Sequence, residues 1–214
     1  MVIPQRLFVT GIGTDVGKSW ATGWLAREAA RAGRSVITQK FIQTGNCRRS
    51  EDIEVHRRIM GIDLQPRDLD LTTAPLILSY PASPHLAAEI DNVTIDWETP
   101  QRSLETLSRE YDCVIVEGAG GALVPLTADY LTADWVAEHR LPAAVVTNGQ
   151  LGSINHTLLT LEALRNRGVE IALVIYNPHF DTDKVICADT RNYLQRYLAA
   201  HFPKTQWVEM PHEL

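Results

Sequence analysis

The chain has 214 residues, of which 45% are hydrophobic, and this is enough to bury the core of one α/β domain. Its formal net charge of −6 argues against nucleic acid or an anionic membrane as a main partner. No apolar run approaches the roughly 20 residues of a membrane span, and the first residues, MVIPQR, lack signal-peptide character. The three cysteines, Cys47, Cys113 and Cys187, form no metal or redox pattern. We therefore expect one cytoplasmic domain over residues 1–214, in a compartment that keeps thiols reduced.

The first predicted element is a strand over residues 7–10, which runs into a phosphate-binding loop and a helix over 18–32. Gly11, Gly13 and Gly17 allow the backbone to turn tightly and to point N–H groups at an anion. Lys18 and Ser19 open the helix, and in such loops the Lys reaches the terminal phosphates while the Ser hydroxyl binds Mg²⁺. Five residues separate Gly11 from Gly17, where the usual phosphate loop has four. The order of strand, glycines, GKS and helix nevertheless predicts nucleoside triphosphate binding.

Further strands are predicted over residues 35–39, 113–116, 143–147 and 171–176, with weaker candidates at 75–80 and 206–208. Helices are predicted over 52–60, 100–109, 132–139, 153–167 and 183–199. Strands that alternate with helices predict an α/β fold: a doubly wound, mostly parallel sheet with helices on both faces, P-loop NTPase-like. Trp20 and Trp24, four residues apart on the first helix, are expected to pack rather than to form a ligand platform.

In this architecture ligands bind at the carboxyl ends of the strands, so the residues there are the candidates for chemistry. Lys40 follows the second strand and is a candidate second cation over the phosphates or the reacting group. Glu117 follows the third strand, where a carboxylate beside a phosphate loop can hold Mg²⁺ directly or through water. The next glycine, Gly118, lets the backbone approach a ligand closely. Asp52 starts a helix and by itself indicates only a favourable helix-end charge.

Two later strand ends also carry polar residues. The helix that starts with SIN at 153–155 can bind an anion such as a substrate carboxylate at its N-terminus, or Ser153 can simply cap an amphipathic helix. Asn177 follows the fifth strand in a turn and could present its amide to a nucleotide base. The histidines, His56 among them, form no ligand spacing and no Ser-His-Asp arrangement.

Other stretches keep the order found in one known family: KFIQTG at 40–45, SPHLAAE at 83–89, EGAGGALVPL at 117–126, ADWV at 133–136 and LGSINHTLLT at 151–160. With the long loop FVTGIGTDVGKS at 8–19, they make nearly the whole chain resemble the ATP-dependent dethiobiotin synthetase family. LGSINHTLLT is the most specific of them, because ordinary P-loop ATPases have no reason to carry it. The resemblance implies a homodimer whose substrate site straddles the subunit interface.

The resemblance also implies a reaction, the closure of a cyclic urea. One amine of 7,8-diaminopelargonic acid takes up CO₂ to give a carbamate, and ATP converts the carbamate to a carbamic–phosphoric anhydride. The second amine then displaces phosphate and forms dethiobiotin. Such chemistry needs cations and N–H donors around the transferring phosphoryl group, which explains the lysines and the glycine loop.

The family's residue roles transfer to matching positions of this chain. The implied catalytic residues are Lys40, Lys18 and Thr14, and the implied ligands of Mg²⁺ are Ser19, Asp52 and Glu117. The implied nucleotide site consists of Gly13, Thr14, Asp15, Val16, Gly17, Lys18, Ser19, Glu117, Gly118, Asn177 and Pro211. The implied substrate site consists of Thr14, Lys40, Thr44 and Tyr193, with Gly152, Ser153 and Asn155 of the partner subunit on the tail carboxylate.

Three residues depart from the family pattern. Asp15 stands where Glu is more familiar, Phe41 follows Lys40 where Pro is expected, and Gln150 occupies a position that can hold Lys. The absence of Pro at 41 predicts a less constrained backbone at Lys40, and the absence of Lys at 150 removes a cation near the tail carboxylate. These departures bear on substrate affinity and base preference rather than on the type of reaction.

Three other readings compete with this one. A nucleotide-switched ATPase of the partition or septum-positioning type should carry a second Lys in the glycine loop, where this chain has Ile12 and Thr14. A related amide-forming or acyl-transferring enzyme would usually need a further domain. A third possibility is a degenerate paralogue that binds nucleotide without turnover, and the intact set of Lys18, Ser19, Lys40 and Glu117 argues against it. The sequence therefore favours the synthetase.

Overall fold

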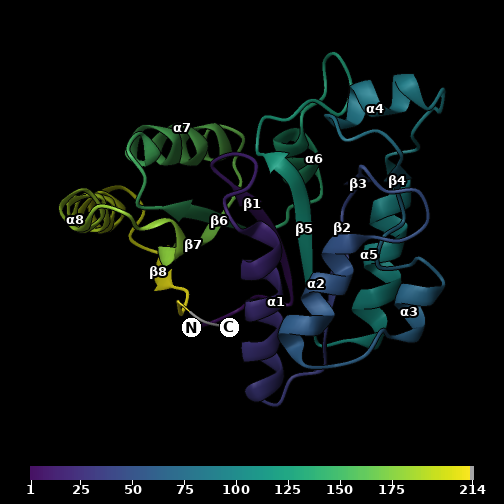
Figure 1. The fold of residues 1–214 in the computed structure, drawn as a ribbon, viewed down its shortest axis with the longest axis horizontal. Coiled ribbons are helices and arrows are strands. Elements are labelled where there is room, and N and C mark those ends of the chain that lie inside the picture. The colour runs from purple at the N-terminus through teal and green to yellow at the C-terminus, as the bar shows by residue number, and fades with distance from the viewer. Residues whose placement is uncertain (213–214) are drawn as a thin grey trace.

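The computed structural model describes residues 1–212 and places six parallel strands of this region in one sheet, in the order β2-β5-β1-β6-β7-β8 (Figure 1). These strands are β1 Arg6–Gly11, β2 Val36–Lys40, β5 Cys113–Gly121, β6 Ala143–Asn148, β7 Ile171–Asn177 and β8 Gln206–Glu209. The expected doubly wound sheet is confirmed, and the weak candidate at 206–208 is an edge strand paired with β7. The loop after β1 lies between the ends of β5 and β6, at the edge of the sheet where this architecture binds ligands.

The helices cover both faces of the sheet. They are α1 Lys18–Arg31, α2 Glu51–Met60, α5 Glu98–Glu110, α6 Thr132–Glu138, α7 Ser153–Arg165 and α8 Lys184–His201. All six lie within two residues of their predicted bounds, because their apolar faces repeat with the helical period. Strand β4 Ile77–Leu78 lies within the weak candidate at 75–80, and it pairs separately with β3 Gln43–Thr44. The other short elements were not predicted: β3, α3 Pro66–Leu69, α4 Pro84–Ile90 and the 3₁₀ turn Pro178–Phe180.

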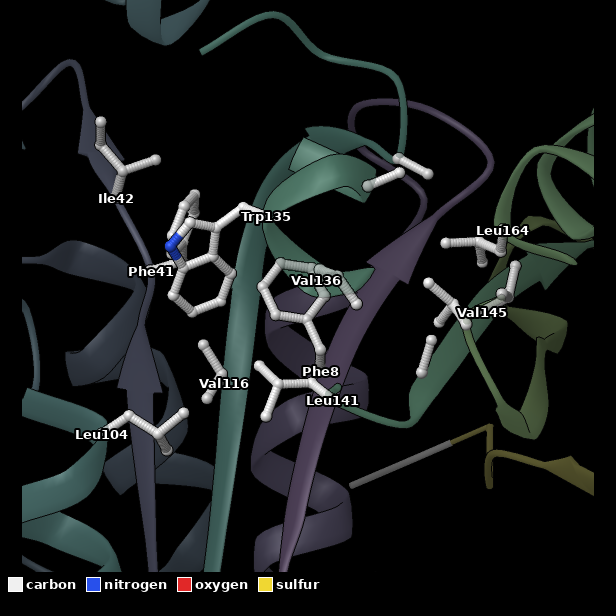
Figure 2. Close-up of a cluster of buried hydrophobic side chains, with 14 of the residues drawn as sticks. Phe8, Phe41, Ile42, Leu104, Val116, Trp135, Val136, Leu141, Val145 and Leu164 are labelled. Carbon is white, nitrogen blue, oxygen red and sulfur yellow. The ribbon is translucent and has the colours of Figure 1, made fainter. Parts of the chain in front are cut away.

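Alternation along the strands divides the core into two layers. In β1, Leu7 and Val9 face the layer that contains the buried residues of α1 and Ile59 of α2. Phe8 faces the opposite layer, with buried residues of α5, α6 and α7 (Figure 2). The same alternation in β2 and β5 turns polar residues near the strand ends toward α1 and α2, and this placement creates the site described below.

Phe41, the residue after Lys40, is held by both its side chain and its backbone. Its side chain is fully buried beside Trp135, with ring centroids 4.5 Å apart, and near Phe8 (Figure 2). Its ring also stacks on that of Trp97. Its backbone N–H donates to the Glu117 carbonyl at 2.8 Å, which Pro could not do. The expectation of a less constrained backbone at this point is therefore wrong.

Helix α2 is held against α1 by a close approach. Ser50 caps α2 by accepting a hydrogen bond from the Ile53 N–H, and Gly61 ends it in the left-handed conformation. A Cβ on Gly23 of α1 would lie 3.0 Å from Ile59 and 3.2 Å from the Cα of His56. A glycine at this position therefore allows the two helices to pack closely enough to place α2 side chains under the end of the sheet.

Within residues 1–212, no helix is both long and apolar enough to cross a membrane. All three cysteines are free thiols: Cys113 and Cys187 are buried, whereas Cys47 is exposed shortly after β3.

Candidate active site

The loop between β1 and α1 folds around the Lys18 side chain, whose ammonium donates to the Gly13 carbonyl at 2.8 Å. Gly17 has a φ of 92°, and a Cβ there would lie 2.2 Å from Nδ2 of Asn177. Glycine is therefore required both for the backbone conformation and for the approach of the end of β7. Since Gly17 is the N-cap of α1, no side chain at the N-cap occupies the first N–H groups of the helix, and these are suited to bind phosphate.

A cavity of about 1240 Å³ lies beside this loop at the carboxyl edge of the sheet. Pockets for one small ligand are usually roughly 300–1,000 Å³, so the cavity has room for a nucleotide and a second molecule. Most of the predicted site residues line it: Thr14, Asp15, Gly17, Lys18, Ser19, Lys40, Thr44, Asp52, Glu117, Asn177 and Pro211. Three others are not among the lining residues: the Gly13 carbonyl accepts a hydrogen bond from Lys18, Val16 packs in the core, and Gly118 lies against Phe8.

Four polar side chains converge at the floor of the cavity. The Ser19 hydroxyl oxygen lies 2.9 Å from Oδ1 of Asp52 and 2.9 Å from Oε1 of Glu117. The Lys40 ammonium lies 2.5 Å from Oδ2 of Asp52 and 2.9 Å from Oε1 of Glu117. Asp52, of which the sequence pattern by itself indicated little, is thus part of the cluster.

Strand register brings Lys40 and Glu117 together. The two residues are paired directly across β2 and β5. Cys113 and Ile115 face the α1 and α2 layer, so Glu117, two residues further along the strand, points the same way. The sequence predicted that Glu117 would follow this strand. It lies inside the strand instead, since β5 continues to Gly121. This burial leaves the carboxylate 1% exposed.

The charges of the cluster stabilise one another. Burial disfavours the Glu117 carboxylate, but the Lys40 ammonium and the His56 hydrogen bond outweigh burial and hold its pKa well below the usual range. Burial also disfavours the charged form of Lys40, yet Glu117 and Asp52 raise its pKa above the ordinary value. For Lys18, burial prevails and lowers the pKa to about 8, although Glu117 acts in the opposite direction.

His56 is the site residue that the sequence pattern missed. Its ring is fully buried, with Nε2 2.6 Å from Oε2 of Glu117 and Nδ1 3.0 Å from Oγ1 of Thr38. The available signal was its spacing of four residues from Asp52, which puts both side chains on the same face of α2.

Asn177, at the end of β7, lines the cavity. Asn177 uses its amide within the protein, because Nδ2 donates to the Val16 carbonyl at 3.1 Å and Oδ1 accepts from the His179 N–H. Each of these atoms keeps capacity for one further hydrogen bond.

The two tryptophans of α1 differ in their surroundings. Trp24 is buried, as expected. Trp20 is 48% exposed and lines the cavity, so the expectation that it only packs is wrong.

The residues expected to bind a carboxylate tail lie apart from this cavity. Gly152, Ser153, Asn155 and Tyr193 are not among its lining residues. The Ser153 N–H, expected to be open to an anion, donates to the Gln150 carbonyl at 3.0 Å, and its hydroxyl donates to Asn148. Asn155 is exposed on α7, and Tyr193 is 38% exposed on α8.

The donor set of the cluster fits Mg²⁺, although no group of three or more His, Cys, Asp or Glu side chains in residues 1–212 could hold a metal ion alone. Ser19, Asp52 and Glu117 offer a hydroxyl and two carboxylates at short mutual distances. Hard oxygen donors of this kind, few in number and completed by phosphate and water, suit Mg²⁺ at nucleotide sites.

A strand that ends in a glycine loop, with Lys18 and Ser19 opening the next helix over a parallel sheet, defines a P-loop nucleotide-binding protein. Residues 5–206 match the family model described as an AAA domain. The chain is 46% identical to ATP-dependent dethiobiotin synthetase BioD 2 of Pasteurella multocida (strain Pm70), over 95% of each sequence. It is 48% identical to dethiobiotin synthetase BioD of Chlorobaculum tepidum, over 89% of this chain and 80% of that one. The chain belongs to the ATP-dependent dethiobiotin synthetase family.

Solved structures support the fold independently. The chain aligns with the signal recognition particle receptor FtsY of Elizabethkingia anophelis in complex with GDP, at a TM-score of 0.56 and 14% identity, over 100% of this chain and 59% of that one. It also aligns with pNOB8 ParA bound to nonspecific DNA, at a TM-score of 0.54 and 14% identity, over 96% of this chain and 79% of the other. At this identity the likeness concerns the fold alone.

Proposed function

We propose that this protein closes the ureido ring of dethiobiotin from 7,8-diaminopelargonic acid and CO₂, with conversion of ATP to ADP and phosphate. The observation that carries the proposal is the position of Lys40, whose ammonium lies in the same cavity as that of Lys18, beside Glu117. A carbamate and a γ-phosphate are both anions, and their approach requires two cations. The relatives' names and this second ammonium point to the same reaction.

The proposed chemistry has three steps. One amine nitrogen attacks CO₂ and loses a proton, which gives a carbamate. A carbamate oxygen attacks the γ-phosphorus of ATP, the bond from that phosphorus to the bridging oxygen breaks, and ADP leaves. The second amine nitrogen attacks the carbonyl carbon, the bond from this carbon to the phosphate oxygen breaks, and phosphate and a proton leave.

The residues of the cavity divide between the two reactants. Lys18 contacts the γ-phosphate, and the amide groups of the glycine loop bind the other phosphates. Lys40 stabilises the charge that develops between carbamate and phosphate, held in place by Asp52 and Glu117. Thr14 and Thr44 also line the cavity, which supports contact with the diamine and its carbamate.

Ser19, Asp52 and Glu117 would hold Mg²⁺ in this scheme. The ion, when bound, would neutralise charge on the β- and γ-phosphates. Their proximity supports this assignment, because Oε1 of Glu117 and Oδ1 of Asp52 each lie 2.9 Å from the Ser19 hydroxyl oxygen. The adenine would occupy the end of the cavity near Asn177 and Pro211.

A homodimer would complete the substrate site. The proposed carboxylate-binding residues lie outside the phosphate-loop cavity of their own chain, which supports their acting on the substrate of a partner subunit. Leu151, in the turn before α7 and 87% exposed, and Leu159, within α7 and 58% exposed, are apolar side chains suited to an interface. We further propose that residues 1–214 act as one domain in the cytoplasm.

The test is mass spectrometry of the product formed from ATP, Mg²⁺, bicarbonate and 7,8-diaminopelargonic acid, with phosphate release measured in parallel. The proposal requires a product that is heavier than the diamine by the mass of CO₂ minus that of water, because one carbonyl bridges the two nitrogens in place of two hydrogens. It also requires phosphate release that depends on both diamine and bicarbonate. Phosphate release that ignores the diamine would instead identify a switch ATPase. The control is the Lys40→Met variant, which keeps the length of the side chain without its charge. We expect it to lose product formation if the charge of Lys40 is required.

A further inference from the structure

A buried chain of polar side chains runs from α3 to the floor of the active site. The Arg57 guanidinium binds both carboxylate oxygens of Asp68, each at 2.8 Å, and its Nη1 donates to Oγ1 of Thr38 at 2.8 Å. Thr38 contacts Nδ1 of His56, and Nε2 of His56 contacts Glu117. Every member is at most 9% exposed. Nothing in the proposed chemistry uses the four residues behind Glu117.

The donors along this chain can be assigned in one consistent direction. Arg57 can only donate, so Thr38 Oγ1 accepts from it. The Thr38 hydroxyl proton is then free to go to Nδ1 of His56, which accepts it. The ring proton consequently lies on Nε2 and is donated to Oε2 of Glu117.

This bond determines which way the Glu117 carboxylate faces. Its Oε2 is held by His56, and its Oε1 is the oxygen that lies 2.9 Å from both the Ser19 hydroxyl and the Lys40 ammonium. Without the ring, the carboxylate could rotate and present either oxygen, or both, to Lys40. The His56 donor on the side away from the cavity therefore binds Oε2 and leaves Oε1 available to the cavity.

We propose that His56 is a positioning residue for Glu117, and that Thr38, Arg57 and Asp68 hold the His56 ring in the orientation that turns Oε1 of Glu117 toward the metal and phosphate site. The proposal rests on the assignment of Glu117 to the site of Mg²⁺ and ATP. Helix α2 then serves the site twice, since Asp52 lies in the cavity and His56, one turn later, supports the neighbouring carboxylate. The close packing at Gly23 makes this second role possible.

Three substitutions of His56 separate support of Glu117 from general packing. His56→Gln keeps an N–H donor near the position of Nε2 and can still reach Glu117. His56→Asn keeps a polar group near the position of Nδ1, which can reach Thr38 but not Glu117. His56→Leu removes both and fills a similar volume.

The readout is binding of Mn²⁺, an oxygen-ligated stand-in for Mg²⁺, to the complex of the protein with ADP, followed by electron paramagnetic resonance. We expect His56→Leu and His56→Asn to weaken Mn²⁺ binding roughly 10- to 100-fold, the usual effect of losing a residue that supports a metal ligand. His56→Gln should restore most of the affinity. Calorimetric binding of ADP in EDTA should stay within about twofold for all three, because the N–H groups of the phosphate loop are unchanged.

Other outcomes would overturn the proposal in distinguishable ways. If His56→Asn binds Mn²⁺ as well as His56→Gln, or if His56→Leu binds it like the unchanged protein, His56 only packs. If the unchanged protein binds ADP without any effect of Mn²⁺, the assignment of Glu117 to a metal site fails and this proposal fails with it. If His56→Leu does not fold, Thr38→Val takes its place, because it keeps the ring and removes its support; unchanged Mn²⁺ binding in that variant would then overturn the proposal.

Discussion

The Lys18 side chain is only 7% exposed, and its burial lowers its pKa to about 8, well below the ordinary value of 10.5. Between these two pH values the unfolded chain keeps a proton that the folded chain has lost, so the free energy of unfolding rises with pH. We predict that the protein gains stability relative to Lys18→Met as the pH rises from about 8 to 10.5. Urea denaturation of both proteins across this range measures the effect, and parallel pH profiles would contradict it.

Replacement of Lys18 also tests the role of its charge in the reaction. We predict that Lys18→Ala lowers the rate of phosphate release in the complete reaction roughly 100- to 1,000-fold, the scale on which one preorganised donor acts. The fold should survive, because the side chain lines the cavity and its loss removes one hydrogen bond, to the Gly13 carbonyl. Thermal unfolding provides the control, and near-normal turnover in a folded variant would refute the assignment of the loop.

At the scale of elements, two substitutions of Phe41, directly after β2, separate the contribution of its backbone hydrogen bond from that of its ring. Phe41→Pro removes both the hydrogen bond from residue 41 to the Glu117 carbonyl and the ring between Trp97 and Trp135, whereas Phe41→Leu removes only the ring. We predict that Phe41→Pro is less stable than Phe41→Leu by about 1 kcal/mol, the usual worth of one such bond. Urea denaturation of the pair gives this difference. Equal stabilities would show that the bond contributes nothing.

The long elements could be predicted from the sequence because each has a clear apolar period or an apolar run bounded by turns. Of the short ones, β4 and β8 were only weak candidates, and α3, α4 and β3 were missed: α3 and α4 have only four and seven residues, and β3 pairs with β4 from more than thirty residues away. The end of β5 was misplaced because its last residues include three glycines, which are depleted in strands.

Site residues could be predicted where their own sequence context marked them, and they were missed where only the fold brings them together. Lys18, Lys40 and Glu117 were found because charged residues beside apolar strands and a glycine loop are conspicuous in a sequence. His56 was missed because its partners, Thr38 and Glu117, come from two other elements and meet it only through the strand register. The Ser153 N–H was misjudged because a local turn to Gln150 occupies it.

At the scale of the whole molecule, the proposed dimer makes Asn155 a test of the shared site. Asn155 is exposed on α7 and does not line the cavity of its own chain. If its amide binds the tail carboxylate of the partner's substrate, Asn155→Ala removes a hydrogen bond to a charged group, worth about 1.5–3 kcal/mol. We predict a rise in KM for 7,8-diaminopelargonic acid of roughly ten- to a hundredfold, with ATP affinity nearly unchanged. Steady-state kinetics with each substrate varied in turn measure both values.

Mixed dimers distinguish a shared site from one within a single chain. A dimer of one Asn155→Ala subunit and one Lys18→Ala subunit has one composite site with both native residues and another with neither. Mixing should therefore recover activity with the native KM. If the site lies within one chain, no site in the mixture has both residues and the high KM persists. A chain that is active as a monomer would also contradict the shared site.

Of the three thiols, one is accessible and lies close in sequence to the cavity, so the protein can be labelled there with a dye. Cys113 and Cys187 are enclosed in the protein, and burial raises the pKa of the Cys113 thiol, which further slows its attack on alkylating reagents. Cys47 is accessible and follows Thr44, which lines the cavity, by three positions. A maleimide dye therefore labels one position selectively, without any substitution. Its emission would report the arrival of ligands at the mouth of the cavity in real time, including under single-turnover conditions.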